Sequence, residues 1–334
     1  MDIGSIESGK LDIKVLTTNT TLATLLDKEN LKGKVKQPGP LGARLLGEHG
    51  LSLLFDIKDG DQKKKLLLDA GGANESILYN AKILRLKFKE INTFILSHGH
   101  IDHFGGMEKL LPNLKEGCEI IISPEAYLNN VILVPADNNY YSPEELSKNY
   151  ANLAKQIDNK YSIPLPPFSK KMVNNLVAEN KLNLIEAKEP IKLNEGIITS
   201  GPIELFNEDE STKGFYLKKD NDTFVKNTFR DENSIYINVK DKGLVVITGC
   251  GHAGIVNTIK HGQKLTGVNK IYAVIGGFHE EWNPIETVQR KVNFIKELNP
   301  EIICGMHCTG FIFNKLIADH PAHVLGISGT EFRF

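Results

Sequence analysis

The sequence lacks the features of a membrane or secreted protein. It has no uninterrupted apolar run near the ~18 residues that a membrane-spanning helix needs. Its first ten residues, MDIGSIESGK, carry acidic side chains and no apolar stretch, so we expect no secretory signal. Only four cysteines occur among 334 residues, too few for a disulfide framework, which favours a protein of the reducing cytoplasm.

An excess of charge of either sign is also missing. The chain has 40 basic and 41 acidic residues and a formal net charge of −1. Such a balance gives no overall attraction to nucleic acid or to a membrane surface. We therefore expect a small-molecule substrate rather than a nucleic acid, and the sequence leaves a homo-oligomer open.

The composition is that of a globular protein with a substantial core, since 41% of the residues are hydrophobic. Short β-rich runs alternate with helical patterns, which predicts a layered α/β architecture. No linker or internal repeat is evident, so we expect a single domain over residues 1–334. Residues 137–181 are rich in Asn, Lys and Tyr and predict a helical insertion, either a solvated excursion or a lid over an active site.

Individual elements follow from apolar runs and their flanking residues. Buried strands are predicted at 12–18, 51–57, 65–69, 93–97, 118–123, 181–187, 196–201, 234–239, 243–248, 271–277 and 301–306, with a last strand near 323–333. Helices are predicted at 105–114, from Pro124, at 254–265, near 284–298 and near 310–319.

The segment SHGHIDHFGG, residues 97–106, holds three of the ten histidines of the chain. His98 and His100 follow an apolar strand with period-two spacing, so both should point the same way. Asp102 and His103 come next, as the chain turns toward a helix. Imidazole and carboxylate ligands together suit zinc, or else iron or manganese. The segment therefore predicts a metal site with room for two adjacent ions.

The spacing His98-x-His100-x-Asp102-His103 after an apolar strand resembles the signature of the metallo-β-lactamase superfamily. That resemblance extends over nearly the whole chain. It implies a four-layer αββα sandwich with mixed sheets and two divalent metal ions, zinc foremost, at one sheet edge. Asp69, which ends the run LLLD, resembles the family's first motif and would then hold the metal ligands in orientation. The alternative for Asp69 is an ordinary turn residue before two glycines.

The second half departs from the family pattern. Pro202 stands where the family has its next histidine, and no histidine lies between His103 and His252. Cys250 occupies the place of a bridging aspartate, and a thiolate is a good zinc ligand. His252 could supply the missing imidazole. A packed glycine-rich turn is the alternative for both residues.

The last family motif is a histidine after a late strand, and His307 matches it. The resemblance makes His307 a ligand of the second metal, together with Asp102 and His103. Cys304 and Cys308 flank His307. They could form a separate metal site or a redox pair, but core positions are favoured.

Four short segments resemble a narrower prokaryotic subgroup: EHGLSLL (48–54), TGCGHAG (248–254), GGFH (276–279) and HCTG (307–310). Members of that subgroup carry the name of dihydropterin-ribofuranosylaminobenzene-phosphate synthases of the methanopterin pathway. His49 and His279 match its segments. Each could contact substrate or metal, or could be a structural histidine.

Residues 249–254 also fit the pattern GxGxxG between a strand and a helix, the context of a dinucleotide-binding turn. That turn needs an acidic residue about 20 positions on, at the end of the next strand. The next strand ends in Ile275-Gly276-Gly277, so we do not expect a dinucleotide. The glycines more plausibly let the backbone approach the metal site.

Together these residues predict a metal-dependent hydrolase, in which Asp102 orients a metal-activated water that attacks a small-molecule ester or phosphoester. The subgroup resemblance suggests a phosphorylated pterin-type metabolite. The first alternative is an acyl hydrolase acting on a lactone, thioester or lactam. The second alternative is a metal-centred oxidoreductase, and the third is a metal-bound binding protein without turnover.

Overall fold

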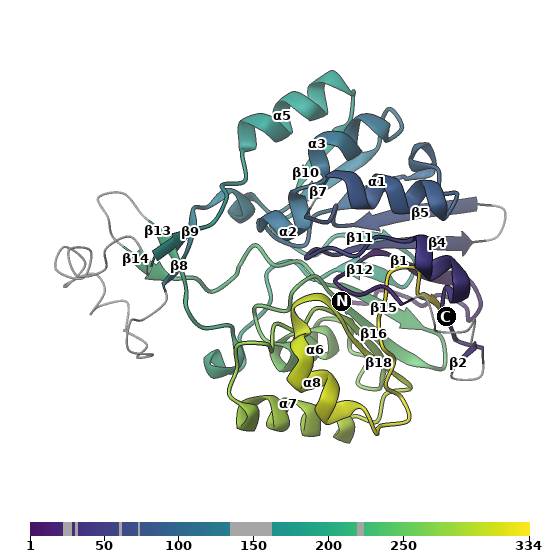
Figure 1. Ribbon diagram of the computed structural model, residues 1–334, viewed down its shortest axis with the longest axis vertical. Coiled ribbons are helices and arrows are strands. Elements are labelled where there is room, and N and C mark those ends of the chain that lie inside the picture. Colours follow the sequence, from purple (N-terminus) through teal and green to yellow (C-terminus); the bar gives the residue numbers. More distant parts are fainter. Residues whose placement is uncertain (23–28, 31–32, 60–61, 73, 134–161, 219–223) are drawn as a thin grey trace.

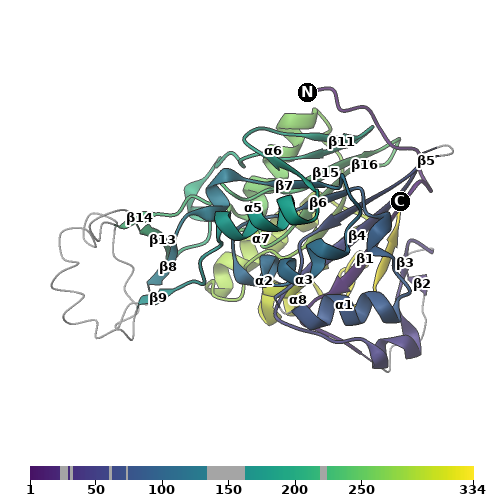
Figure 2. The same cartoon turned by 90° about the horizontal axis from the view of Figure 1, so that it is seen from above.

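The computed structural model describes residues 1–22, 29–30, 33–59, 62–72, 74–133, 162–218 and 224–334 (Figure 1). Among these residues, no helix combines the length and the apolar content needed to cross a bilayer. Two large sheets lie face to face, and helices cover the outer face of each (Figures 1 and 2).

The first large sheet, as described, has nine strands in the order β10-β7-β6-β5-β4-β1-β19-β3-β2. Its strands β5, β6 and β7 run parallel, and an antiparallel hairpin joins β4 to β5. The strand bounds are β1 Leu11–Thr17, β2 Glu29–Asn30, β3 Val35–Lys36, β4 Ser52–Asp59, β5 Gln62–Leu68, β6 Thr93–Ile95, β7 Glu119–Ile122, β10 Asn183–Glu186 and β19 Glu331–Arg333.

The second large sheet has six described strands in the order β11-β12-β15-β16-β17-β18. Its last three strands are parallel. All residues of β16 and β17 are buried, as expected for central strands covered on both faces. The bounds are β11 Lys192–Asn194, β12 Ile197–Thr199, β15 Ile235–Val239, β16 Gly243–Thr248, β17 Ile271–Gly276 and β18 Ile302–Gly305.

Three apolar clusters separate the layers. One lies between the sheets, where Phe55 of β4 shares a cluster with Val245 of β16. The second packs the nine-stranded sheet against α1 Asn74–Ile83, α3 Met107–Leu110 and α5 Lys170–Glu179. The third packs the six-stranded sheet against α6 Ile255–Thr266, α7 Ile285–Glu297 and α8 Gly310–Ile317. The predicted four-layer αββα sandwich with mixed sheets is therefore confirmed.

A small third sheet projects from the sandwich (Figure 1). Its described strands follow the order β14-β13-β8-β9, with bounds β8 Asn130–Leu133, β9 Ser162–Pro164, β13 Phe215–Lys218 and β14 Phe224–Lys226. The sequence did not predict this sheet, because its strands are short and carry mixed polar and apolar residues.

The predicted insertion at 137–181 is only partly described, since residues 137–161 lie outside the described ranges. The described remainder holds strand β9 and helix α5. Val173, Met172 and Leu176 of α5 pack into the same cluster as α1 and α3. This helix therefore belongs to the outer layer of the sandwich.

Other predicted elements need smaller corrections. The helix predicted at 105–114 is α3 followed by a 3₁₀ turn, Leu111–Asn113, that contains Pro112. The helix predicted from Pro124 is only a 3₁₀ turn, Pro124–Tyr127. The last strand is confined to β19, because the chain turns before it at Gly329, whose φ is +91°. Helix α1 was missed.

Candidate metal centre

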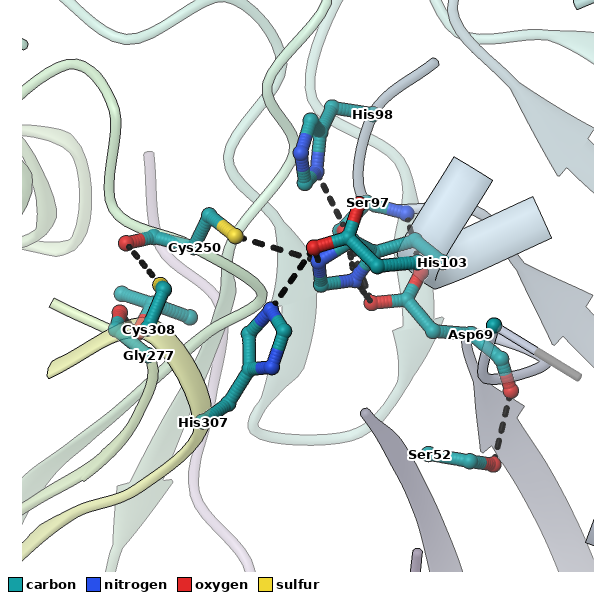
Figure 3. A network of polar contacts seen from close by, with 12 residues as sticks. Ser52, Asp69, Ser97, His98, His103, Cys250, Gly277, His307 and Cys308 are labelled. Carbon is teal, nitrogen blue, oxygen red and sulfur yellow. Dashed lines mark hydrogen bonds and ion pairs between the residues drawn. The ribbon is translucent and has the colours of Figure 1, made fainter. Parts of the chain in front are cut away.

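Both large sheets end their parallel strands at one edge of the sandwich. Asp69 directly follows β5, and the segment 97–103 follows β6 and opens the short helix α2, Ile101–Phe104. From the other sheet, Cys250 follows β16 and His307 follows β18. Residues predicted from distant segments thus meet at one place (Figure 3).

Asp69 anchors the first half of this site. Its buried carboxylate accepts hydrogen bonds from Nδ1 of His103 at 2.6 Å and from the Ser97 backbone N–H and hydroxyl, both at 2.7 Å. Since a carboxylate only accepts, His103 carries its proton on Nδ1. Nε2 of His103 then faces Sγ of Cys250 at 3.1 Å.

The Ser97 hydroxyl fixes the orientation of His98. Its only hydrogen donates to Asp69, so its oxygen accepts a hydrogen bond from Nδ1 of His98 at 2.9 Å. Nε2 of His98 is therefore the unprotonated nitrogen of the neutral ring. It faces Nε2 of His252 at 3.2 Å.

Asn19 orients His307. Its amide nitrogen donates to the His307 carbonyl at 3.3 Å, which fixes the orientation of the amide group. The amide oxygen, 3.2 Å from Nδ1 of His307, therefore accepts from that nitrogen. Nε2 of His307 then faces Oδ2 of Asp102 at 3.0 Å.

The donors fall into two groups whose ligand atoms lie within 4.8 Å of one another. Asp102, His103, Cys250 and His307 form one group, and His98, Cys250 and His252 form the other. Cys250 belongs to both. His100 belongs to neither, although its ring centroid lies 4.5 Å from that of His98 and 4.8 Å from that of His252.

These donor sets fit divalent metal ions. The unprotonated Nε2 of His307 faces the ionised carboxylate of Asp102, an arrangement that is repulsive without a positive charge nearby. Nδ1 of His252 is buried and has no hydrogen-bond partner. Imidazole, thiolate and carboxylate are the usual ligands of zinc.

Burial and mutual repulsion keep most of the histidines neutral. Burial lowers the pKa of His98 and His252 well below the ordinary value, and lowers the pKa of His100 and His307 to about 4. His103 is the exception: burial opposes protonation, but Asp69 and Asp102 raise its pKa well above the ordinary value.

The cysteine and the aspartate of the centre differ in charge. Burial raises the pKa of the Cys250 thiol well above its ordinary value, so a thiolate there needs a bound cation. Burial also acts to raise the pKa of Asp102, but His103 and His307 hold it well below the ordinary value. Asp102 is therefore an anion.

Three residues at this site have a strained backbone. Asp69, His279 and His307 have φ values of +61°, +49° and +54°, in the left-handed region that non-glycine residues rarely occupy. Gly249 shows close backbone approach, because a Cβ there would collide with the Ser97 side chain. The glycine-rich run 249–254 thus packs against the centre, as the sequence indicated.

A pocket of about 490 Å³ opens onto this centre. His49, His279 and Cys308 line it beside the metal-ligand candidates, whereas Cys304 lies in the core between the sheets. His49 is mostly exposed, with Nε2 3.7 Å from Oδ2 of Asp102. His279 is buried, and burial lowers its pKa to about 3.

The pocket has an apolar wall formed by Ile101, Ile132, Leu165, Phe215 and Trp282. The rings of His100, Phe215 and Trp282 stack in that order. The interplanar angle is 20° between His100 and Phe215 and 13° between Phe215 and Trp282. Trp282 at its outer end is 58% exposed. Among the described residues, neither lysine nor arginine lines this pocket.

Comparison with known proteins identifies the family. A protein of Methanocaldococcus jannaschii named 7,8-dihydropterin-6-methyl-4-(beta-D-ribofuranosyl)-aminobenzene-5'-phosphate synthase is 31% identical over 268 residues, which cover 79% of this chain and 82% of that protein. A fold match is Tm1679, described as a metal-dependent hydrolase of the beta-lactamase superfamily, with a TM-score of 0.66 and 21% identity, covering 97% of this chain and 99% of that one. The chain belongs to the metallo-β-lactamase superfamily.

Two further matches to this metallo-β-lactamase superfamily member are an uncharacterised relative and a family model that covers only part of the chain. An uncharacterised protein of Methanocaldococcus jannaschii is 29% identical over 291 residues, covering 85% of this chain and 95% of that protein. The family model for the Anti-Pycsar protein Apyc1 matches residues 54–123, which include the segment 97–103.

Sequence patterns missed three polar residues around the centre of this metallo-β-lactamase-fold protein. Asn19 lies beyond β1, with no motif to mark it. Asp231 and Glu232 lie a few residues before β15, whose first residue, Ile235, pairs with Ile247 near the end of β16. Two acidic residues before a buried strand beside Cys250 are a signal that could have found them. Pro202, by contrast, is not among the donors that the structure brings together.

Proposed function

We propose that this protein is a hydrolase that uses two divalent metal ions, zinc foremost, to cleave an ester or phosphoester bond of a small molecule. The observation that carries the proposal is the convergence of His, Cys and Asp donors in two groups that share Cys250, with Nε2 of His98 3.2 Å from Nε2 of His252 and the unprotonated Nε2 of His307 3.0 Å from Oδ2 of Asp102. A cation beside Nε2 of His307 and the Asp102 carboxylate would relieve the repulsion between them.

The two donor groups would each hold one ion, with Cys250 belonging to both. When bound, such ions supply a water of lowered pKa and stabilise negative charge on a substrate oxygen. The residues of the chain prepare for that chemistry. Asp69, Ser97 and Asn19 accept the Nδ1 protons of the histidines and so turn the Nε2 lone pairs inward. Asp102, ionised and in the pocket wall, is placed to accept a hydrogen bond from the attacking water and to orient it.

We further propose a phosphorylated pterin-type compound as the substrate. The similarity to the Methanocaldococcus jannaschii protein, whose name contains a dihydropterin and a phosphate, supports this choice. The exposed indole of Trp282, backed by Phe215, offers a face on which a flat heteroaromatic ring can stack. The phosphoryl group would then lie at the metal end of the pocket.

An uncharged acyl substrate is the second candidate. No described residue lining the pocket is a lysine or arginine, so the pocket wall offers no cationic side chain to a phosphate. A lactone, thioester or lactam would not need one. Measured turnover of a pterin phosphate and of uncharged acyl compounds distinguishes the two candidate substrates.

The test combines metal analysis with a substrate panel. Wild type and the double variant His98→Ala, His100→Ala are purified without added metal, and bound metal is counted. Each is assayed with a pterin phosphate, a simple phosphodiester, a lactone, a thioester and a lactam. We expect close to two metal ions per wild-type chain, turnover of the pterin phosphate, and loss of both metal and turnover in the variant. Full metal content and activity in the double variant would refute the proposed site.

A further inference from the structure

Residues 231–233 lie between the two loops that supply the metal-ligand candidates. Oδ2 of Asp231 accepts the backbone N–H of Gly99, between His98 and His100, at 3.0 Å. The two carboxylate oxygens of Glu232 accept the backbone N–H groups of His252 and Ala253, each at 2.7 Å. These two loops belong to opposite sheets, so the paired carboxylates connect the halves of the sandwich at the centre.

The adjacent backbone strengthens this connection. The N–H of Asn233 donates to the carbonyl of Ser97 at 2.7 Å, just before His98. All three residues of the segment are at most 5% exposed. The loop 97–103 and the loop 249–253 are therefore held to one short rigid segment.

The choice of carboxylates points to a role beyond hydrogen bonding. Among the described residues, no lysine, arginine or histidine forms an ion pair with Asp231 or Glu232. A buried anion without a cation is costly, and a neutral Asn or Gln oxygen would also accept a backbone N–H. Divalent ions at the neighbouring donor groups would supply the missing positive charge.

We propose that Asp231 and Glu232 form a carboxylate clamp that aligns the two ligand loops and so sets the affinity of the centre for metal. They are positioning residues, since they contact backbone N–H groups beside the ligands and not the ligand atoms. This inference rests on the proposed function only in assuming that the centre binds divalent metal. It adds two residues that no family motif marks in this chain.

The test measures metal affinity directly. Metal-free wild type, Glu232→Gln and Asp231→Asn are titrated with Zn²⁺ against a competing chelator, and with Co²⁺ to follow the absorption band that a Cys250 thiolate gives on binding cobalt. Gln at 232 keeps one of the two hydrogen bonds and sets an amide N–H against the other donor. Asn at 231 can keep its hydrogen bond to Gly99 and removes only the charge.

The matched control is Glu210→Gln. Glu210 is also buried, at 6% exposure, but its carboxylate is paired with Arg290 and Lys291 and, among the described residues, makes no hydrogen bond to the loop 97–103 or the loop 249–253. The unfolding temperatures of the metal-free proteins show how much stability each variant loses.

We expect Glu232→Gln to weaken Zn²⁺ binding by about 10- to 100-fold and to alter the cobalt spectrum, with a smaller effect for Asp231→Asn. Glu210→Gln should keep wild-type affinity and spectrum even where its unfolding temperature falls. Wild-type affinity and spectrum in both clamp variants, or an equal loss in the control, overturns the proposal. If Glu232→Gln does not fold, the metal titration of Asp231→Asn alone tests the proposal. Wild type that binds no metal would instead overturn the proposed function.

Discussion

The Nε2 atoms of His98 and His252 lie 3.2 Å apart, although 154 positions separate the two residues in the sequence. One follows a strand of the nine-stranded sheet and the other follows a strand of the six-stranded sheet. Their approach therefore depends on how the two sheets pack, and the centre forms only in the folded chain. Several measurements can test what this geometry implies.

Cys250→Ser should lose metal without losing the fold. A serine hydroxyl is a poor zinc ligand, and Cys250 belongs to both donor groups, so we expect the metal content to fall by at least one ion per chain. Metal analysis of the purified variant measures this. The matched control is Cys304→Ser, which places a hydroxyl in the core between the sheets and should lower the unfolding temperature while keeping the metal. Unchanged metal in Cys250→Ser would argue against a thiolate ligand.

Asn19→Ala should impair turnover more than stability. Asn19 is exposed, but its amide fixes the proton of His307 on Nδ1. Removing that partner should lower kcat by about 10- to 100-fold, while the free energy of unfolding changes by roughly 0.5 kcal/mol or less. Steady-state kinetics and thermal unfolding provide both values. Asn113→Ala, another exposed position, serves as the control, and equal kinetics in the two variants would contradict the role of Asn19.

The metal-free protein should lose stability as the pH falls below 6.5. Five buried histidines have lowered pKa values and stay neutral when folded, whereas the unfolded chain protonates them below about pH 6.5: His98, His100, His252, His279 and His307. The unfolded state then binds more protons, and acid favours unfolding.

Four other buried groups act in the opposite direction: His103, whose pKa Asp69 and Asp102 raise, and the acids Asp231, Glu232 and Glu280, whose pKa values burial raises. Burial raises the pKa of Asp231 to about 6 and that of Glu232 to about 7, so each contributes stability that is lost as the pH rises toward those values. The five histidines outnumber these four groups, so we expect a lower unfolding temperature at pH 5 than at pH 7. A thermal scan of the chelator-treated protein at both values checks the sign, and a higher midpoint at pH 5 would show that the four opposing groups dominate.

Trp282→Ala should weaken binding of a flat-ring substrate. Stacking on an aromatic side chain is worth about 1–3 kcal/mol, so we expect KM to rise about 5-fold or more with kcat nearly unchanged. Because Trp282 is the single tryptophan of the chain, quenching of its fluorescence reports ring binding in wild type without turnover. Phe311→Ala, which removes a ring that is 73% exposed, is the control. A pterin that is hydrolysed without quenching would place the ring elsewhere.

Much of the sandwich was predictable, because strands such as β16 and helices such as α6 have local signatures. A six-residue run with four consecutive aliphatic residues, and a helix between Gly254 and Gly267, can be recognised without knowing their neighbours. The small sheet of β8, β9, β13 and β14 was not predictable, since short strands of mixed polarity have no distinct period.

The sequence by itself determined which chemistry the centre can hold, because His98, Asp102 and His103 lie in one short segment whose spacing is set by the backbone. It also marked Asp69, Cys250, His252 and His307 by their positions after strands. Only the tertiary structure decided which of these donors meet, and it added Asn19 and the Asp231–Glu232 pair. The physical reason is that contacts across two packed sheets depend on strand register and layer packing, which no local pattern encodes.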